Sequence, residues 1–378
     1  MNITPTDVAH QGQVIAQYRK ARKWSQEDLA EALCIDVRTV QRMEKQPMIK
    51  SINRRELLVG LLGIPLAFMG LESQKLTEKT NFIFNNDRMS FYEGEMAARW
   101  ELFHTGGTIR AARGLDMWTA EIASFAQSFQ NTGWHERTLA LLTMSYQLQN
   151  CVSRDLMDFT QAHRAAKNAY HIAKELNDPE LIASALTHEG IALLQQERPI
   201  EAIKYLSGAL KAIHYVGLPS LKGYISQALS EAYAKAQLSQ ECWRSIGLAE
   251  RDLEQPDQFQ PRGKIHFFAS SITAQKGINA VLLHDHHRAL ALIDKSLASY
   301  NPTFVRGRAR LLSQKAESFY GRGHIEESVN TAEEALTLAR SVGSNKTIAR
   351  INTLHTTLAQ STWRKERSIA RLGALLSQ

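Results

Sequence analysis

The sequence predicts an all-α protein in which a small helical domain precedes a long array of paired helices. Three observations indicate this fold class. Apolar residues recur at helical spacing along most of the chain, sustained alternation of polar and apolar residues is rare, and one residue frame repeats about every 40 residues in the C-terminal half. The 378 residues, of which 44% are hydrophobic and 22% charged, suffice for a globular chain of two or three domains.

Positive charge gathers near the N-terminus, although the whole chain is only mildly basic. The formal net charge is +7 and the pI is near 9.2, which permits an anionic partner without identifying one. Residues 38–55 hold six lysines and arginines but one acidic residue, Glu44. Residues 72–87 lack a clear period and contain Asn-Asn-Asp, which is typical of a linker. We therefore expect a domain at 1–71, a linker at 72–87 and a helical domain at 88–378.

The first domain begins with three predicted helices. Apolar residues share one face of the first, over residues 11–23. Ser25 and Asp28 have the S-x-x-D spacing of a capping box, which predicts that a second helix begins there. Asp36 is the expected N-cap of a third helix over residues 37–45.

The end of this domain is strongly apolar. A fourth helix is predicted from near Asn53 to a glycine C-cap at Gly63. Residues 57–71 carry no charge, but Pro65 interrupts them and a membrane-spanning helix needs about 20 residues. We predict that a second short apolar helix follows and is buried, so that no membrane partner is expected. The alternative is a membrane tether formed by residues 57–71.

Residues 11–64 resemble the helix-turn-helix domains of the Cro/CI-type (XRE) family. A helix-turn-helix joins two helices by a short turn, with a small residue, here Ala30, packed at the elbow. The matching residues are Arg19, Ser25, Gln26, Leu29, Ala30, Ile35, Thr39, Val40, Arg42, Met43 and Glu44. The chain departs from the family pattern at Cys34, where a turn glycine is usual, and at Lys45-Gln46, where Glu-x-Gly is usual.

The resemblance implies that the third helix enters the DNA major groove. Arg38 and Arg42 are four residues apart, hence on one helical face, and an arginine fork can bond guanine O6 and N7 together. Val37 would contact a thymine methyl group. Phosphate contacts are expected from Gln26, Thr39, Gln41, Lys45 and Lys50. Arg19 and Glu44 match a family ion pair inside the domain, so their expected role is structural.

One residue frame recurs along the rest of the chain. In residues 185–213 it consists of Gly190, Leu193, Ala202, Leu206, Ala209 and Leu210, and its first position recurs at 230, 277 and 316. Small residues at these positions let two antiparallel helices approach closely. The pattern resembles tetratricopeptide repeats over about residues 135–340 and implies a right-handed superhelix of helical hairpins. Residues 88–132 are expected to form another hairpin and residues 347–378 a terminal cap. An unrelated helical bundle is the alternative.

Stacked helix pairs of this kind line a concave groove with their inner helices. In the usual repeat geometry, groove positions fall six and three residues before the first frame position, and one, four and five after it. With the frame extended back to Thr143, this rule gives Arg137, Gln147, Tyr224, Gln227, Glu231, Lys235, Arg310, Glu317 and Tyr320. Charged, amide and tyrosine side chains suit a short peptide. The alternatives are an ordinary hydrated surface or a dimer interface.

A helix-turn-helix followed by such repeats is similar to the Rgg/PlcR/PrgX-like (RRNPP) regulators of bacteria. The similarity implies a cytoplasmic, sequence-specific transcriptional regulator that binds double-stranded DNA as a homodimer. It also implies control by a signalling peptide or protein, which in that group alters the spacing of two DNA-binding heads. The alternative is a protein-interaction scaffold whose head binds DNA weakly or not at all.

The sequence does not motivate catalysis, a cofactor or a metal site. The three cysteines are far apart and odd in number, which argues against a zinc finger or a disulfide framework and fits a reducing compartment. No glycine-rich loop carries the Lys-Ser/Thr of a phosphate-binding loop. The run His284-Asp285-His286-His287 would fall in a turn between paired helices, where solvated polar residues are common. We therefore expect no enzyme, no cofactor and no bound metal.

Overall fold

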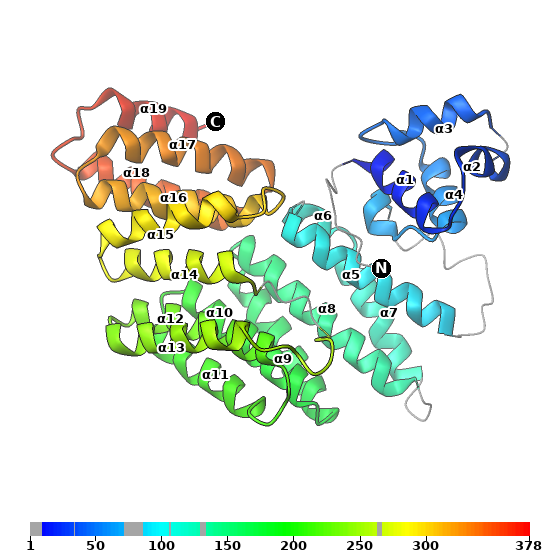
Figure 1. Cartoon of the computed structure of the whole chain (residues 1–378), viewed down its shortest axis with the longest axis horizontal. Coiled ribbons are helices and arrows are strands. Elements are labelled where there is room, and N and C mark those ends of the chain that lie inside the picture. Colours follow the sequence, from blue (N-terminus) through cyan, green and yellow to red (C-terminus); the bar gives the residue numbers. More distant parts are fainter. Residues whose placement is uncertain (1–9, 34, 72–85, 106, 129–133, 263–266) are drawn as a thin grey trace. The chain divides into compact units, whose positions relative to one another are not determined.

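The computed structural model describes residues 10–33, 35–71, 86–105, 107–128, 134–262 and 267–378 (Figure 1). Every regular element in these ranges is a helix, which confirms the predicted all-α class. Contacts between residues divide the chain into two compact units, Met1–Leu141 and Leu142–Gln378. The first unit holds the N-terminal domain and further helices, and the second holds most of the paired-helix array.

Four helices and one short 3-10 helix build the N-terminal domain. Their bounds are α1 (Gln11–Ala21), α2 (Gln26–Ala32), α3 (Val37–Glu44), α4 (Ile52–Leu62) and η1 (Leu66–Met69). The core between them contains Ile15, Leu29, Val40 and Met43, each at most 3% exposed. Full burial of one such side chain stabilises a fold by about 1.5–3 kcal/mol. The four helices expected from the sequence are thus confirmed, and a shared core holds them together.

The apolar stretch at the end of this domain folds back instead of continuing as one long helix. Gly63 ends α4 in the left-handed conformation at φ 68°, and Pro65 directly precedes η1. Leu66 and Met69 are buried, and Arg55 Nη1 donates a hydrogen bond to the Met69 carbonyl oxygen at 2.7 Å. The predicted second short apolar helix is therefore confirmed as one 3-10 turn.

The first compact unit continues past the N-terminal domain. Helix α5 (Asn86–Thr105) packs against η1, and the Glu95 carboxylate accepts a hydrogen bond from the Ala67 amide at 3.0 Å. Helices α6 (Thr108–Ala112) and α7 (Leu115–Ser128) follow, so the hairpin expected at residues 88–132 contains a third, short helix. Residues 72–85 of the expected linker lie outside the described residues, and the last two linker positions already belong to α5.

The remaining helices form an array of pairs. Their bounds are α8 (His135–Asp155), α9 (Phe159–Glu175), α10 (Pro179–Gln195), α11 (Pro199–Ala212), α12 (Pro219–Lys235), α13 (Ser239–Leu253), α14 (Ala269–Leu282), α15 (His286–Ser299), α16 (Val305–Gly321), α17 (Ile325–Ser341), α18 (Asn345–Gln360) and α19 (Arg367–Leu376). In the second unit, α10 packs on α11, α12 on α13, α14 on α15 and α16 on α17, and successive pairs contact each other. The stretch expected as a cap, 347–378, forms the further pair α18 and α19.

Small residues lie where paired helices cross, as the frame predicts. A Cβ atom added to Gly190 would lie 2.7 Å from Leu206 Cγ of the next helix, and one added to Gly277 would lie 2.7 Å from Ile293 Cγ1. Seven residues after each first frame position, the chain turns through the left-handed conformation, at Glu197, Gln237, His284 and Gly323. The repeat is therefore one of backbone conformation as well as of side-chain packing.

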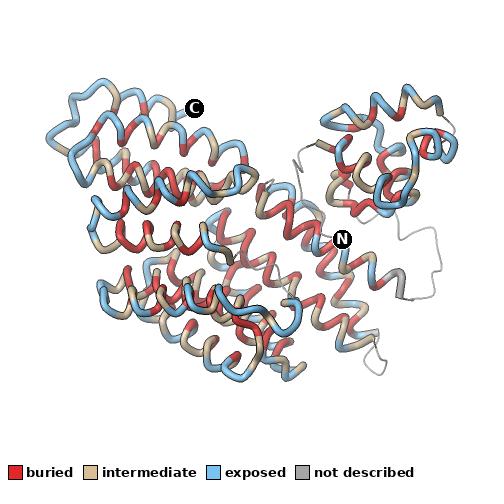
Figure 2. The backbone as a smooth tube through the Cα atoms, in the orientation of Figure 1, coloured by how far each residue is buried: buried red, intermediate tan, exposed pale blue. Residues whose placement is uncertain are grey.

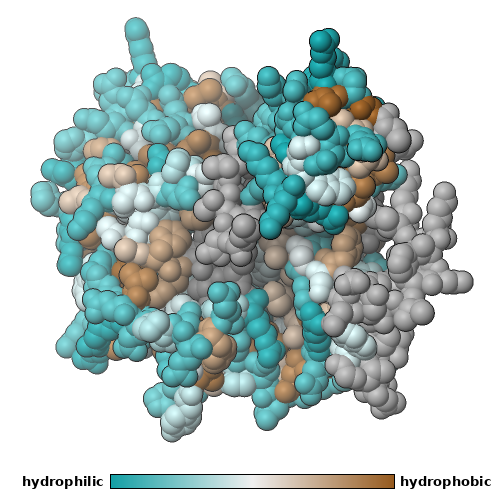
Figure 3. Space-filling model, turned by 45° about the vertical axis from the view of Figure 1, so that its right-hand side comes forward, coloured by the Kyte–Doolittle hydropathy of each residue, from teal (hydrophilic) through white to brown (hydrophobic). Residues whose placement is uncertain are grey.

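Burial follows the helical period throughout the array. Figure 2 shows buried positions recurring between exposed ones along its helices. On the face shown in Figure 3, hydrophilic residues cover most of the described surface. Within the described ranges, no helix combines the length and the apolar composition that crossing a bilayer requires.

Candidate nucleic-acid interface and inner charged cluster

Two capped helix starts set the geometry of the helix-turn-helix. Ser25 Oγ accepts a hydrogen bond from Asp28 N at 3.0 Å, and Asp28 Oδ2 accepts one from Ser25 N at 2.7 Å, which confirms the predicted capping box. At the start of α3, Asp36 accepts hydrogen bonds from the Thr39 amide at 2.9 Å and the Thr39 hydroxyl at 2.7 Å. The hydroxyl hydrogen bond lowers the pKa of Asp36, so this cap keeps its charge well below neutral pH. Cys34, the expected departure from the family pattern, lies outside the described residues.

A buried ion pair joins α1 to α3. Arg19 Nε donates to Glu44 Oε1 at 2.6 Å and Arg19 Nη2 donates to Glu44 Oε2 at 3.2 Å, with the two side chains 8% and 9% exposed. Arg19 Nη1 also donates to the Trp24 carbonyl oxygen at 2.7 Å. Gln26 Nε2 donates to Glu44 Oε2 at 2.7 Å, so this side chain, expected at a DNA phosphate, has a partner inside the domain. The network holds α3 in a fixed orientation against α1 and α2.

The outer side of α3 is open to solvent. Val40 and Met43 bury the inner side, while exposed positions on the outer side are Arg38, Gln41, Arg42 and Lys45. Neither Arg38 nor Arg42 makes a side-chain hydrogen bond or ion pair with a residue that the structure describes. Val37 is half-buried against the domain core. Two unpaired guanidinium groups thus lie on one exposed helical face, free to contact an anionic partner.

In the second compact unit, charged side chains of four helices meet. Arg310 Nη2 donates to Glu231 Oε2 at 2.7 Å and links α16 to α12. Arg306 Nε lies 3.3 Å from Asp155 Oδ2 and links α16 to α8. Asp155 Oδ1 also accepts a hydrogen bond from Ser344 Oγ, directly before α18, at 2.8 Å. We call the following six residues the inner charged cluster: Arg154, Asp155, Glu231, Arg306, Arg310 and Lys346.

Cations outnumber carboxylates four to two in the inner charged cluster, and the pKa values reflect this excess. Burial by itself would raise the pKa of Glu231, but the positive charges of Arg310, Lys346 and Lys235 outweigh it and lower that pKa to about 2. Burial, followed by the positive charge of Arg310, lowers the pKa of Lys346 to about 7. A further positive charge is therefore unfavourable at the cluster. Lys346 is the member of the cluster whose pKa lies near neutral pH.

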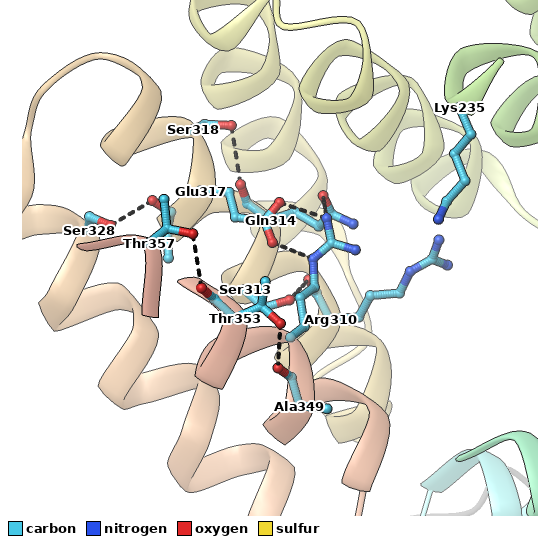
Figure 4. A network of polar contacts seen from close by, with 12 residues as sticks. Lys235, Arg310, Ser313, Gln314, Glu317, Ser318, Ser328, Ala349, Thr353 and Thr357 are labelled. Carbon is cyan, nitrogen blue, oxygen red and sulfur yellow. Dashed lines mark hydrogen bonds and ion pairs between the residues drawn. The ribbon is translucent and has the colours of Figure 1, made fainter. Parts of the chain in front are cut away.

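Two further ion pairs flank the inner charged cluster. Arg350 of α18 donates to both oxygens of Glu317 on α16, at 2.5 and 2.6 Å, and to Gln314 Oε1 at 2.8 Å. Lys235 of α12 pairs with Glu197 at 2.5 Å, and Figure 4 shows its side chain pointing toward that of Arg310. These pairs are electrically neutral, so they leave the charge excess of the cluster unchanged.

The structure corrects the repeat frame at its N-terminal end. The left-handed turn after α8 falls at Met157, with φ 67°, so the first frame position is Asn150 and the extension to Thr143 is wrong. The groove rule then gives Met144, Gln147, Cys151, Arg154 and Asp155 on α8. Arg137 no longer satisfies that rule; instead it pairs with Glu93 of α5 at 2.6 Å, in the first compact unit.

Sequence reasoning missed Arg306, Lys346 and Arg350. Lys346 and Arg350 follow Arg306 and Arg310 by 40 residues, the same step that separates the first frame positions 190 and 230. The sequence predicts that the repeats end near residue 340 and that a terminal cap follows, so this prediction does not extend the 40-residue spacing into α18. The last inner helix, α18, contributes charged side chains like the inner helices before it.

The other expected groove residues have different environments. Gln147 Nε2 and Gln227 Oε1 are buried and have no hydrogen-bond partner among the residues described. Tyr224 is half-buried, and burial raises the pKa of its hydroxyl. Tyr320 packs edge-on against Trp363, with ring centroids 6.3 Å apart, outside the inner charged cluster.

The histidine run predicted to fall in a turn does so only in its first half: His284 and Asp285 lie between α14 and α15, whereas His286 and His287 begin α15. His284 adopts the left-handed conformation at φ 63° between α14 and α15, and Asp285 caps α15 by accepting a hydrogen bond from Arg288 N at 3.1 Å. Over the described ranges, no three histidine, cysteine or acidic side chains come close enough to hold a metal ion.

The comparisons with known proteins define the class of the N-terminal domain. Residues 15–69 match a family model described as helix-turn-helix, a range that runs from within α1 to the end of η1. The chain thus carries a helix-turn-helix domain, which is a DNA-binding fold and not a catalytic one, followed by an array of helical hairpins.

No curated protein matches the chain. Among solved structures, the chain is similar to the crystal structure of Bacillus thuringiensis PlcR in complex with the peptide PapR7 and DNA. The two share 13% sequence identity over 93% of this chain and 100% of the other, with a TM-score of 0.39.

Proposed function

We propose that the chain is a sequence-specific DNA-binding transcriptional regulator whose helical array binds a short peptide or a segment of a partner protein. The observation that carries the proposal is the pair of unpaired, exposed guanidinium groups of Arg38 and Arg42 on the second helix of a helix-turn-helix. In such domains this helix enters the major groove, where one arginine fork on guanine contributes about 1–3 kcal/mol of discrimination. Val37, next to Arg38, has an apolar side chain that can contact a thymine methyl group.

Phosphate contacts fall to the exposed polar residues beside this face, Gln41, Lys45 and Lys50. Gln26 and Thr39 have a smaller part in this proposal, because Glu44 and Asp36 already engage their side chains. Arg19 and Glu44 orient α3 and take no part in base contacts.

Buried side-chain amides of α8 and α12 support peptide binding by the array. Gln147 and Gln227 each hold a buried amide atom that lacks a partner, and the backbone of an extended peptide offers both donors and acceptors. We further propose that the regulator acts in the cytoplasm as a homodimer, because a two-fold symmetric pair of heads matches two operator half-sites. The peptide would then act by binding one dimer geometry better than another.

A selection from random DNA tests the proposed DNA binding. The full chain is incubated with a pool of random duplexes, and the bound fraction is sequenced over several rounds. We expect the parent to enrich a guanine-containing motif and the double variant Arg38→Ala/Arg42→Ala to lose that enrichment. Arg54→Ala is the matched control, because Arg54 is an exposed arginine of the same domain on α4. Equal enrichment by the parent and the double variant would favour a scaffold role instead.

A further inference from the structure

Two positive charges of the inner charged cluster have no carboxylate partner among the residues that the structure describes. Arg306 and Arg310 pair with Asp155 and Glu231, whereas Arg154 and Lys346 pair with no carboxylate in the described ranges. Arg154 Nη2 donates to the Cys151 sulfur at 3.1 Å, a weak acceptor, and Arg154 Nε is buried without a partner among the described residues. A folded chain that holds unmatched cations side by side is destabilised by their repulsion and desolvation.

Of the two cations without a carboxylate partner, Lys346 is more exposed than Arg154, which is buried. Its side chain is half-buried, and its ammonium makes no hydrogen bond or ion pair with any residue of the described ranges. The charged groups that face it are Arg154 and Asp155 of α8, Glu231 of α12 and Arg310 of α16. An anion bound at this ammonium would therefore also be attracted by two guanidinium groups from two other helices.

Amide groups one or two helical turns away favour a peptide over an inorganic anion. Gln227 precedes Glu231 by four residues on α12, and Gln147 precedes Arg154 by seven on α8, so each lies on the same helical face as a cluster residue. Gln227 Oε1 needs a donor and Gln147 Nε2 needs an acceptor. Inorganic phosphate near neutral pH supplies acceptors and at most one or two hydroxyl donors on one compact group, whereas a peptide supplies spaced N–H donors, carbonyl acceptors and a carboxylate along its length.

We propose that the inner charged cluster is a carboxylate-binding subsite, in which Lys346 and Arg154 bind a carboxylate group of a short peptide while the unpartnered amides bind its backbone. This inference rests on the proposed peptide binding and names the group of the peptide that is recognised. The two sources of a peptide carboxylate are the C-terminus and an acidic side chain, and the experiment separates them.

Acetylation of Lys346 in the full chain measures occupancy of the subsite. Trace acetic anhydride is added at about pH 6.5, and modification of each lysine is quantified by mass spectrometry with and without succinate or inorganic phosphate. A carboxylate in contact raises a lysine pKa by about one unit or more, which at this pH lowers its reactive fraction roughly eightfold. We expect succinate to slow the acetylation of Lys346 by that factor. Lys276 is the internal control, because its ammonium already pairs with Glu250.

Retention of peptide pools by the immobilised full chain measures which carboxylate is bound. One hexapeptide pool has a free C-terminus and no Asp or Glu, the second is C-terminally amidated and contains Asp and Glu, and the third is amidated and contains neither. We expect the parent to retain the first or the second pool above the third, and Lys346→Met to abolish the difference. Lys276→Met, the matched control, should retain the pools as the parent does.

The outcomes separate this subsite from peptide binding in general. Equal retention of all three pools, unchanged in Lys346→Met, refutes the subsite and leaves the proposed peptide binding intact. Protection of Lys346 by succinate without retention of any pool supports the subsite and refutes peptide binding. Acetylation of Lys346 that is unaffected by succinate, or slowed by phosphate alone, overturns the carboxylate subsite.

Discussion

Replacing Glu44 by alanine removes the acceptor at the centre of the helix-turn-helix. The variant loses two hydrogen bonds from Arg19 and one from Gln26, and it leaves the Arg19 guanidinium buried with the Trp24 carbonyl oxygen as its remaining partner. Breaking a buried ion pair from one side costs about 3–5 kcal/mol, because the other charge stays desolvated. Since Glu44 is 9% exposed and Arg19 keeps one acceptor, we expect the lower end, about 3 kcal/mol.

Hydrogen exchange of the full chain, read by mass spectrometry, resolves this effect within the head. A loss of about 3 kcal/mol corresponds to roughly 150-fold faster exchange in α1 and α3, with the array unchanged. Glu201→Ala is the control, since Arg198 and Glu201 form an equally bidentate pair at 2.6–2.7 Å with both side chains 46% exposed. There we expect less than about threefold faster exchange. Equal effects of the two substitutions would refute the assignment of Arg19–Glu44 as the pair that fixes α3.

Close contacts and charge lead to two further predictions. Gly12→Ala should destabilise the N-terminal domain by about 1–3 kcal/mol in the same exchange experiment, because the added Cβ would lie 2.4 Å from the Met43 carbonyl oxygen. Gly60→Ala is the control: open space surrounds Gly60, so this substitution should be neutral or slightly stabilising. The folded chain releases the Lys346 proton at about pH 7, whereas an unfolded chain holds it to about pH 10.5, so stability should rise with pH between these values. Urea midpoints should accordingly rise less steeply from pH 7 to 9 in Lys346→Met than in the parent, and equal slopes would contradict the lowered pKa.

Local patterns made the head and the repeat predictable. Capping residues act within three positions, so Ser25 and Asp28 are enough by themselves to mark the start of α2 in the sequence. Small residues at fixed spacing mark helix crossings, because steric exclusion at Gly190 and Gly277 depends on the immediate partner helix alone. The extra short helix α6 and the 3-10 turn η1 carry weaker local signals, since each spans five residues or fewer.

Local sequence patterns could not predict which residues come together in the inner charged cluster. Asp155 bonds to Ser344, which lies 189 residues further along the chain, and pairs with Arg306 of α16. Whether these residues come into contact depends on the curvature of the second unit. That curvature is the sum of small rotations between successive helix pairs, so it cannot be read from one short segment. The sequence nevertheless held part of the answer, because Lys346 and Arg350 repeat Arg306 and Arg310 at the established step of 40 residues.

The proposed function depends above all on the exposed face of α3 reading DNA sequence. Its most direct test is the ratio of affinities for the selected site and a scrambled duplex, measured at one salt concentration for the parent, Arg38→Ala, Arg42→Ala and Lys45→Ala. Each arginine substitution should lower the ratio by about five- to 150-fold, which is the equivalent of about 1–3 kcal/mol, and Lys45→Ala should weaken both duplexes alike. A ratio that stays at the parent's value in both arginine variants would show that this helix does not read the base edges.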